Sequence, residues 1–415
     1  MMTTTTTSRS RDTTRRTLGH RGALWTAAAV AALSLWASAA PTVTYPLYAS
    51  SWHLTPTATT AIFAVYPVVL VVFLLVFGQV SDHIGRRVTM LVGVSAMALG
   101  ALLFALAPSV GWVYLGRALS GAGVALALTP ATAAVHELHA EDKKSRASAV
   151  TTAATAVGLA LATVVGGALT EYAPAPLHLS FWVLVAVTGA VLPLIWMMPR
   201  DERPEGLGPW RPRPVRIGRD LRRAYVASAL AVTAAYAFGS VFLALGADVA
   251  RSLVGTTNIF VVGLVLSAMS ATVGLSALGV RRVPAGRQVV TGTLATLVAL
   301  ALLEVSATAH SLPVFLVATT LSGFSYGLMF SGGLGLIAAH APAHARAGAV
   351  AAVYLVAYVL QGATALSLGL VATSSGLGTA LLIGVVAIGL LAVLSLGTAH
   401  ALGRVPGATV ATEVS

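Results

Sequence analysis

The sequence of 415 residues is 57% hydrophobic and only 9% charged, with a mean hydropathy of +0.86. This balance excludes a soluble globular domain, and the long apolar runs lack the alternation of a membrane β-barrel, so we expect a polytopic α-helical membrane protein. The formal net charge of +12 does not indicate nucleic-acid binding, because the cations gather in the loops between apolar runs. The chain has no cysteine, which excludes disulfides and thiolate metal sites.

The first half of the chain begins with a polar tail over residues 1–22, which we expect to be disordered because it has no apolar periodicity. Six membrane-length apolar runs follow within 23–198, at about 23–49, 57–77, 88–107, 111–138, 147–172 and 179–198. Residues 37–39 (Ala-Ser-Ala) resemble a signal-peptidase site. The apolar run continues past them, which favours a helix that is retained.

The second half follows a segment rich in Pro, Gly and Arg, residues 199–223, which we interpret as a linker. Six further runs fill residues 224–403, at about 224–247, 257–280, 288–307, 312–339, 346–372 and 377–402, and a second tail covers 404–415. Of the 25 Lys and Arg residues, 23 lie in the tails, the linker and alternate loops. The positive-inside rule therefore predicts that both termini are cytoplasmic.

The two halves share an internal repeat. Three short patterns recur at offsets of 200 to 202 residues: Gly78 with Gly85-Arg86 as Gly279 with Gly286-Arg287, Leu119-Ser-Gly as Leu321-Ser-Gly, and Arg146-Ala-Ser-Ala-Val as Arg346-Ala-Gly-Ala-Val. Each match lies at the same place in its half, which indicates two parallel six-helix repeats.

A charged turn separates the second and third runs and has the pattern G-x-x-x-D-x-x-G-R-R, from Gly78 to Arg87. This pattern resembles the loop between helices 2 and 3 of the major facilitator superfamily of secondary transporters. The resemblance implies twelve transmembrane helices in two six-helix halves, with a substrate site between them. It also implies an inner gate of Gly78, Asp82, Gly85 and Arg86.

In that gate, Asp82 is expected to face the positive N-terminus of helix 11 when the cytoplasmic side is shut, and Arg86 to add an ionic contact in the same state. The alternative for Asp82 is that it caps a turn.

Two charged residues lie inside apolar runs, where charge is costly. Arg117 begins R-x-x-x-G-x-G, which resembles the family's helix-4 motif and makes Arg117 a candidate for proton coupling or substrate binding. The alternatives are a structural donor to backbone carbonyls and a side chain that snorkels to the interface. Glu304 is a second coupling or substrate candidate, although its place near a helix end favours an interfacial role. Asp248 and Glu171, at outer helix ends, are expected to be solvated.

Polar and aromatic side chains at helical spacing form stripes on the central runs, such as Tyr354, Tyr358 and Gln361 on one face. Together these stripes predict a cavity lined by Ser38, Tyr45, Tyr236, Tyr326, Tyr354, Tyr358 and Gln361. A neutral, aromatic and weakly polar cavity suits amphiphilic molecules. Ordinary helix packing is the alternative for each stripe.

The fifth run contains Gly158 and Gly166-Gly167 in a pattern similar to the helix-5 motif of the exporter branch, although Ala162 and Thr163 replace its Gly-Pro. Small residues at an ordinary helix contact are the alternative. The resemblance as a whole implies a monomeric, proton-driven exporter of amphiphilic or drug-like compounds in the plasma membrane, with no enzyme activity, cofactor or metal. Uptake of a small metabolite such as a sugar, and ligand sensing without translocation, remain alternatives.

Overall fold

The computed structural model describes residues 17–78, 80–138, 144–199, 217–280 and 282–403. The helices are α1 (His20–Ala39), α2 (Tyr45–Trp52), α3 (Pro56–Phe77), α4 (Val80–Ile84), α5 (Arg86–Ala105), α6 (Val110–Glu137), α7 (Lys144–Tyr172), α8 (Leu179–Trp196), η2 (Arg219–Leu221), α9 (Arg222–Ser240), η3 (Val241–Leu245), α10 (Gly246–Asp248), η4 (Val249–Leu253), α11 (Ile259–Gly279), α12 (Ala285–Thr308), α13 (Leu312–His340), α14 (Ala343–Ser375) and α15 (Leu377–Gly403). These residues supply twelve helical spans that are long and apolar enough to cross a membrane, as predicted. Most of the predicted tails and linker lies outside the described residues.

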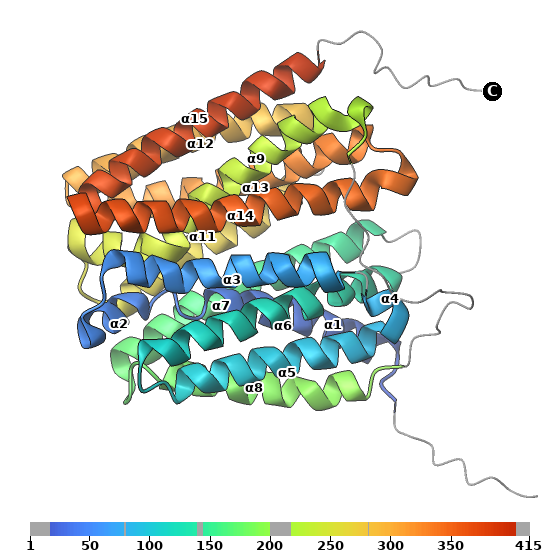
Figure 1. Cartoon of the computed structure of the whole chain (residues 1–415), viewed down its shortest axis with the longest axis horizontal. Helices are drawn as coiled ribbons and strands as arrows, with labels where there is room; N and C mark the ends of the chain where they lie inside the picture. Colours follow the sequence, from blue (N-terminus) through green and yellow to red (C-terminus); the bar gives the residue numbers. More distant parts are fainter. Residues whose placement is uncertain (1–16, 79, 139–143, 200–216, 281, 404–415) are drawn as a thin grey trace, which may run out of the picture.

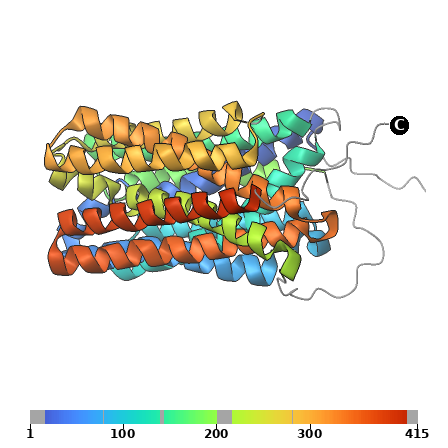
Figure 2. The same ribbon diagram turned by 90° about the horizontal axis from the view of Figure 1, so that it is seen from above.

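The twelve spans form two groups that lie side by side, α1 to α8 and α9 to α15 (Figures 1 and 2). The groups meet mainly along two antiparallel helix pairs, α3 with α14 and α7 with α11. Helix α1 begins and α15 ends at one end of the bundle, on the right in Figure 1, which we call the terminal end. Helix α2 lies at the other end, which we call the distal end.

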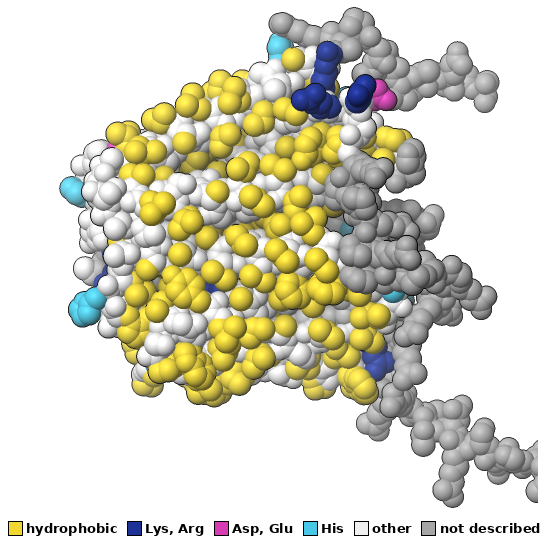
Figure 3. Space-filling model, viewed as in Figure 1, with side chains coloured by type: hydrophobic (Ala, Val, Ile, Leu, Met, Phe, Trp, Pro, Cys, Tyr) yellow, Lys and Arg dark blue, Asp and Glu magenta, His cyan; other side chains and the backbone are white. Residues whose placement is uncertain are grey.

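The surface of the bundle is mostly apolar on the face that Figure 3 shows, and the Lys and Arg side chains gather at the terminal end. Large apolar side chains point outward from both groups, including Leu115 of the first group, which is 55% exposed, and Leu390 of the second, which is 60% exposed. Such a belt matches the hydrocarbon core of a bilayer, in which helices satisfy their own backbone hydrogen bonds.

Small residues line the two contacts between the groups. On the α7–α11 pair, a Cβ on Gly167 would lie 3.0 Å from the carbonyl oxygen of Ile259, and one on Gly274 would lie 2.6 Å from the Cβ of Ala156. On the α3–α14 pair, a Cβ on Gly362 would lie 3.4 Å from the ring of Pro67. The backbones therefore approach closely without large interlocking side chains.

The first span is not the single helix that the sequence predicts over 23–49. Proline has no N–H group, so Pro41 cannot continue the helical hydrogen-bond ladder of α1. The chain instead forms tight turns, in which the backbone N–H groups of Thr44 and Tyr45 donate to the Pro41 carbonyl at 3.0 and 3.2 Å. Helix α2 then begins at Tyr45 with Pro46 in its first turn, where a missing N–H costs little.

The seventh span is longer and less regular than the predicted 224–247. It runs through α9, η3, α10 and η4 to Leu253, and both η3 and η4 are π-helical. Segments of π-helix inside α-helices are rare and often lie at functional sites. Asp248 lies between the two.

Candidate functional site

Arg117 lies on α6 in the interior of the first group, and its side chain is fully buried. Its Nε donates to the Ile62 carbonyl at 3.4 Å and its Nη1 to the Ser38 carbonyl at 2.8 Å. Glycines following Arg117 bring α6 close to its neighbours, because a Cβ on Gly121 would lie 2.6 Å from the carbonyl oxygen of Tyr66. Two of the three guanidinium nitrogens thus bind backbone carbonyls, and burial excludes snorkelling to an interface.

The third nitrogen of Arg117 has no hydrogen bond. Among the described residues, Arg117 Nη2 and the Tyr45 hydroxyl are both buried without a partner, and the two side chains interact electrostatically. No carboxylate of the described part of the chain pairs with Arg117. A buried cation without a counter-ion is costly. Arg117 Nη2 and the Tyr45 hydroxyl can therefore still bind a hydrogen-bond acceptor or an anionic group.

Aromatic rings compensate part of the Arg117 charge. The guanidinium carbon lies 4.8 Å from the ring centroid of Tyr66 and 5.8 Å from that of Phe63. Such cation–π contacts contribute about 2 kcal/mol each when desolvated. Tyr66 was not predicted to belong to the site, although it is the only side chain with a hydroxyl between Thr60 and Gly78, and that isolated polar group was a signal for it.

The four tyrosines predicted from the second half come together in one cluster. The Tyr236 ring on α9 lies 4.9 Å from that of Tyr358 on α14 and 6.0 Å from that of Tyr326 on α13, and the Tyr354 and Tyr358 rings are 6.4 Å apart. Phe330, which was not predicted, completes the cluster at 5.9 Å from Tyr236. We call these five residues the aromatic cluster.

Tyr66 connects the two parts of the site. It lies on α3, which packs against α14 of the second group, and its ring centroid lies 4.8 Å from the Arg117 guanidinium carbon, with Tyr326 and Tyr358 of the second group nearby. The side chain of Ser38, a predicted site residue, also interacts with Tyr66. Gln361, another predicted residue, is buried on α14. The site therefore combines one buried cation in the first group with an aromatic cluster in the second.

The predicted gate residues lie at the terminal end, away from this site. Residues 80–84 form the short helix α4 instead of an open turn, and Gly85 adopts a φ of 91°, which favours glycine. Arg86 forms an ion pair with Glu137 of α6, so its ionic contact here is within the first group. Asp82 is exposed and has no hydrogen bond or ion pair to another described residue. Its predicted contact with helix 11 stays a prediction for a state closed at this end.

Two predicted carboxylates have surroundings that the sequence did not indicate. Glu171 is half-buried, and its Oε2 accepts a hydrogen bond of 2.8 Å from the Ile259 N–H at the start of α11, a contact that the sequence did not indicate. Glu304 lies half-buried on α12, which packs mainly against α13 and α15, and its Oε2 has no partner within the described ranges. It is not among the residues that contact Arg117 or the aromatic cluster.

Hydrogen bonds between the two groups cluster at the distal end. The hydroxyls of Thr57 on α3 and Thr373 on α14 lie 2.7 Å apart, and the Thr57 N–H donates to Thr373 Oγ1 at 3.0 Å. Asn258 donates to the Tyr172 hydroxyl at 3.2 Å, beside the contact of Glu171 with Ile259. We call these contacts the distal seal, because they close the two groups against each other at that end.

Comparison with known proteins identifies the fold. Residues 24–365 match the profile of the Major Facilitator Superfamily. The chain belongs to this family. Members of the family are membrane transporters and not enzymes, and the resemblance stated from the gate pattern and Arg117 is confirmed.

Relatives of this superfamily member match it over short segments. It is 32% identical to the inner membrane transport protein YajR of Escherichia coli (strain K12) over 139 residues, which is 33% of this chain and 30% of that protein. It is 32% identical to the multidrug efflux pump LfrA of Mycolicibacterium smegmatis over 173 residues, 40% of this chain and 33% of LfrA. It is 35% identical to the puromycin resistance protein pur8 of Streptomyces alboniger over 133 residues, 31% of this chain and 26% of pur8. The matched segments span a third or less of these relatives.

Solved structures match over nearly the whole chain. A bacterial homologue of the human lysosomal transporter Spinster, in an inward-facing and unoccupied conformation, has a TM-score of 0.72 at 14% identity, and the match covers 93% of this chain and 97% of that one. The nucleoside transporter NupG has a TM-score of 0.74 at 11% identity, with 92% of this chain and 100% of NupG covered. Identities this low show the shared fold of a multi-pass membrane transporter.

Proposed function

We propose that this transporter exports small amphiphilic compounds by alternating access, driven by the proton gradient. The observation that carries the proposal is the site where the two groups meet, with a buried Arg117 on one side and the aromatic cluster on the other. An amphiphile would stack its apolar body on the tyrosine rings and offer an acceptor group to Arg117 Nη2 and the Tyr45 hydroxyl.

Two relatives support export over uptake. LfrA is described as a multidrug efflux pump and pur8 as a puromycin resistance protein. Both are at least 32% identical in sequence to this chain over the matched segments. Because the matches cover only part of each relative, the substrate class and the direction are carried over here as part of the proposal. Proton coupling rests instead on the resemblance of the segment that begins at Arg117 to the family's helix-4 motif.

The proposed orientation in the membrane rests on charge. Lys and Arg gather at the terminal end, which by the positive-inside rule supports a cytoplasmic location for that end and an outer location for the distal end. In a bacterial plasma membrane, the distal seal would then be the closed outer gate. A compound held between Arg117 and the aromatic cluster would enter from the cytoplasm and leave after the seal opens.

The proposal is tested by the accumulation of fluorescent amphiphilic compounds in cells with and without the protein, each repeated with a protonophore. We expect lower accumulation with the protein and reversal by the protonophore. The double variant Tyr236→Ala/Tyr358→Ala is expected to abolish the difference, whereas Trp25→Ala, which removes an exposed aromatic ring outside the cluster and the distal seal, is expected to retain most of it. Higher accumulation would indicate uptake, and binding without movement in proteoliposomes would indicate a sensor; either result contradicts export.

A further inference from the structure

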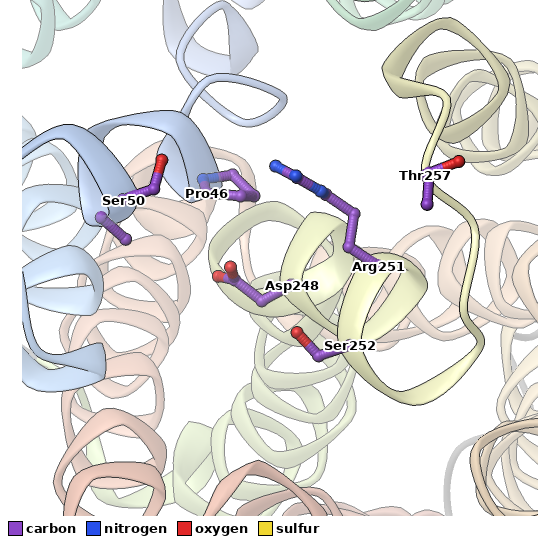
Figure 4. A pocket seen from close by; sticks show the side chains of 7 residues that line it. Pro46, Ser50, Asp248, Arg251, Ser252 and Thr257 are labelled. Carbon is purple, nitrogen blue, oxygen red and sulfur yellow. The ribbon is translucent and has the colours of Figure 1, made fainter.

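A second cavity lies at the distal end, apart from Arg117 and the aromatic cluster. It has a volume of about 390 Å³ and separates α2 of the first group from the seventh span of the second. Figure 4 shows its lining, which is Pro46, Ala49, Ser50, Asp248, Arg251, Ser252 and Thr257. The side chains of Ser50, Ser252 and Thr257 are exposed, so the cavity is open at the distal surface.

Asp248 and Arg251 bring opposite charges into this cavity. Figure 4 shows both side chains directed toward the side of the cavity where Pro46 lies. They interact electrostatically but are not joined by an ion pair, so their charged atoms lie farther apart than 4.0 Å. Neither side chain makes a hydrogen bond or ion pair with any other described residue.

The backbone accounts for the separation of the two charges. Residues three apart on an α-helix are neighbours and readily form ion pairs. Between Asp248 and Arg251 the helix changes from α10 to the π-helical η4, whose wider turn alters that spacing. The seventh span thus presents an anion and a cation side by side, each without a partner.

The wall of the cavity that faces Asp248 and Arg251 carries no charge that could pair with either side chain. Helix α2 contributes Pro46, Ala49 and Ser50, which carry no charge. Partly buried charges without partners are costly unless a ligand or water binds them. A ligand that satisfies both must carry a cation and an anion a few ångströms apart, and the hydroxyls of the lining offer it further hydrogen bonds.

We propose that this cavity binds a small zwitterion, with its ammonium group against Asp248 and its carboxylate against Arg251. The walls come from different groups, so the bound molecule bridges α2 and the seventh span. It therefore stabilises the state in which the distal seal is closed, because the cavity has this shape only while the groups are held together there. The site is a regulatory one and is independent of whether the central site exports amphiphiles.

Calorimetry on the purified full-length protein tests the chemistry of the ligand. The probe is 4-aminobutanoate, and its singly charged analogues are n-butylamine and butanoate. We expect saturable binding of 4-aminobutanoate and at least tenfold weaker binding of either analogue. Equal binding of one analogue, or no saturable binding of the zwitterion, overturns the proposal.

Variants test the location. We expect Asp248→Asn and Arg251→Gln each to weaken 4-aminobutanoate binding at least tenfold. The matched controls Asp220→Asn and Arg219→Gln remove the same charges from exposed positions at the terminal end and are expected to leave it unchanged. Melting curves establish that each variant is folded. Unchanged binding in both folded cavity variants would assign the ligand to another place and overturn the proposal.

A third measurement needs neither cavity variant. The natural chain has no cysteine, so Thr57→Cys/Thr373→Cys supplies the only two thiols, on either side of the distal seal. We expect 4-aminobutanoate to accelerate disulfide formation between them, because it holds the seal closed, and n-butylamine to have no effect. An unchanged or slower reaction with the zwitterion would contradict the bridging role.

Discussion

At the scale of single residues, the contacts of Arg117 distinguish a role in folding from a role in ligand binding. Two backbone carbonyls and two rings hold the guanidinium, yet one nitrogen has no partner within the described residues. A purely structural arginine would be expected to satisfy all its donors. The donor without a partner, Nη2, indicates that the side chain is positioned to bind an acceptor reversibly.

Replacement of Arg117 by Met tests this distinction. The Met variant loses the hydrogen bonds and cation–π contacts of Arg117, but it also removes the desolvation penalty of a buried cation without a counter-ion, so we expect a melting temperature close to that of the natural protein. Loss of a charge-assisted hydrogen bond to the compound, of about 1.5–3 kcal/mol, should lower the initial transport rate roughly 10- to 100-fold. Transport in proteoliposomes and melting curves are the measurements, with Arg219→Met as control. A large fall in melting temperature with retained transport would assign Arg117 to folding alone.

Asp82 carries a second prediction at this scale. It is exposed and unpaired in the described structure, which is closed at the distal end. If Asp82 stabilises the state closed at the terminal end, Asp82→Asn removes a favourable contact with a helix dipole worth about 0.3–1 kcal/mol or more. We expect slower transport with ligand affinity unchanged, measured by uptake into vesicles and by equilibrium binding. Asp220→Asn is the matched control, and a large loss of affinity in the Asp82 variant would contradict the gate role.

At the scale of the helix, periodicity predicted which residues share a face but not what that face meets. Tyr354 and Tyr358 are one turn apart on α14, and both join the aromatic cluster. Tyr66 and Phe330 were missed, because hydropathy and spacing do not show that Tyr66 faces Arg117 or that Phe330 packs against Tyr236. The π-helical segments were missed too, since apolar composition looks the same in α- and π-helix.

Glu171 is another residue whose contacts could not be predicted from the sequence alone. Its position at a helix end predicts a solvated carboxylate, and only the three-dimensional structure reveals that the start of α11 lies beside it. The break at Pro41, by contrast, was predictable, because proline cannot donate to the helical ladder. Hydropathy and the spacing of short patterns were enough to predict the number of membrane spans and the division into two six-helix halves.

The close contact of α7 with α11 leads to a prediction for whole helices. A valine at Gly167 would press against the Ile259 carbonyl and push the two helices apart near the distal seal. We expect Gly167→Val to slow transport severalfold and to slow cross-linking between cysteines at positions 57 and 373. Gly189→Val is the control, because a Cβ at Gly189 meets nothing within 4 Å. Unchanged cross-linking in the Gly167 variant would show that this contact does not govern closure.

At the scale of the whole molecule, two groups of helices meet along two contacts and are joined by hydrogen bonds at the distal end. Alternating access requires that these bonds break in each cycle. Cysteines at Thr57 and Thr373 test that requirement, since the two hydroxyls lie 2.7 Å apart, close enough for a disulfide after substitution.

We expect oxidation of Thr57→Cys/Thr373→Cys to reduce transport in proteoliposomes to background and a reductant to restore it. Each single-cysteine variant should be insensitive to oxidation, because the natural chain contributes no thiol of its own. Full transport by the cross-linked protein would mean that the groups do not separate at this end.

The distal seal also sets an energy scale for the transport cycle. Its contacts are hydrogen bonds of threonine, asparagine and glutamate side chains between helices that carry small residues, and no ion pair of described residues joins the two groups at this end. Each such bond contributes about 0.5–1.5 kcal/mol net, so opening the seal costs only a few kcal/mol. One elementary charge that crosses a membrane potential of 100 mV releases about 2.3 kcal/mol. Under the proposed proton coupling, one or two protons per cycle would supply enough energy to open a seal of this strength.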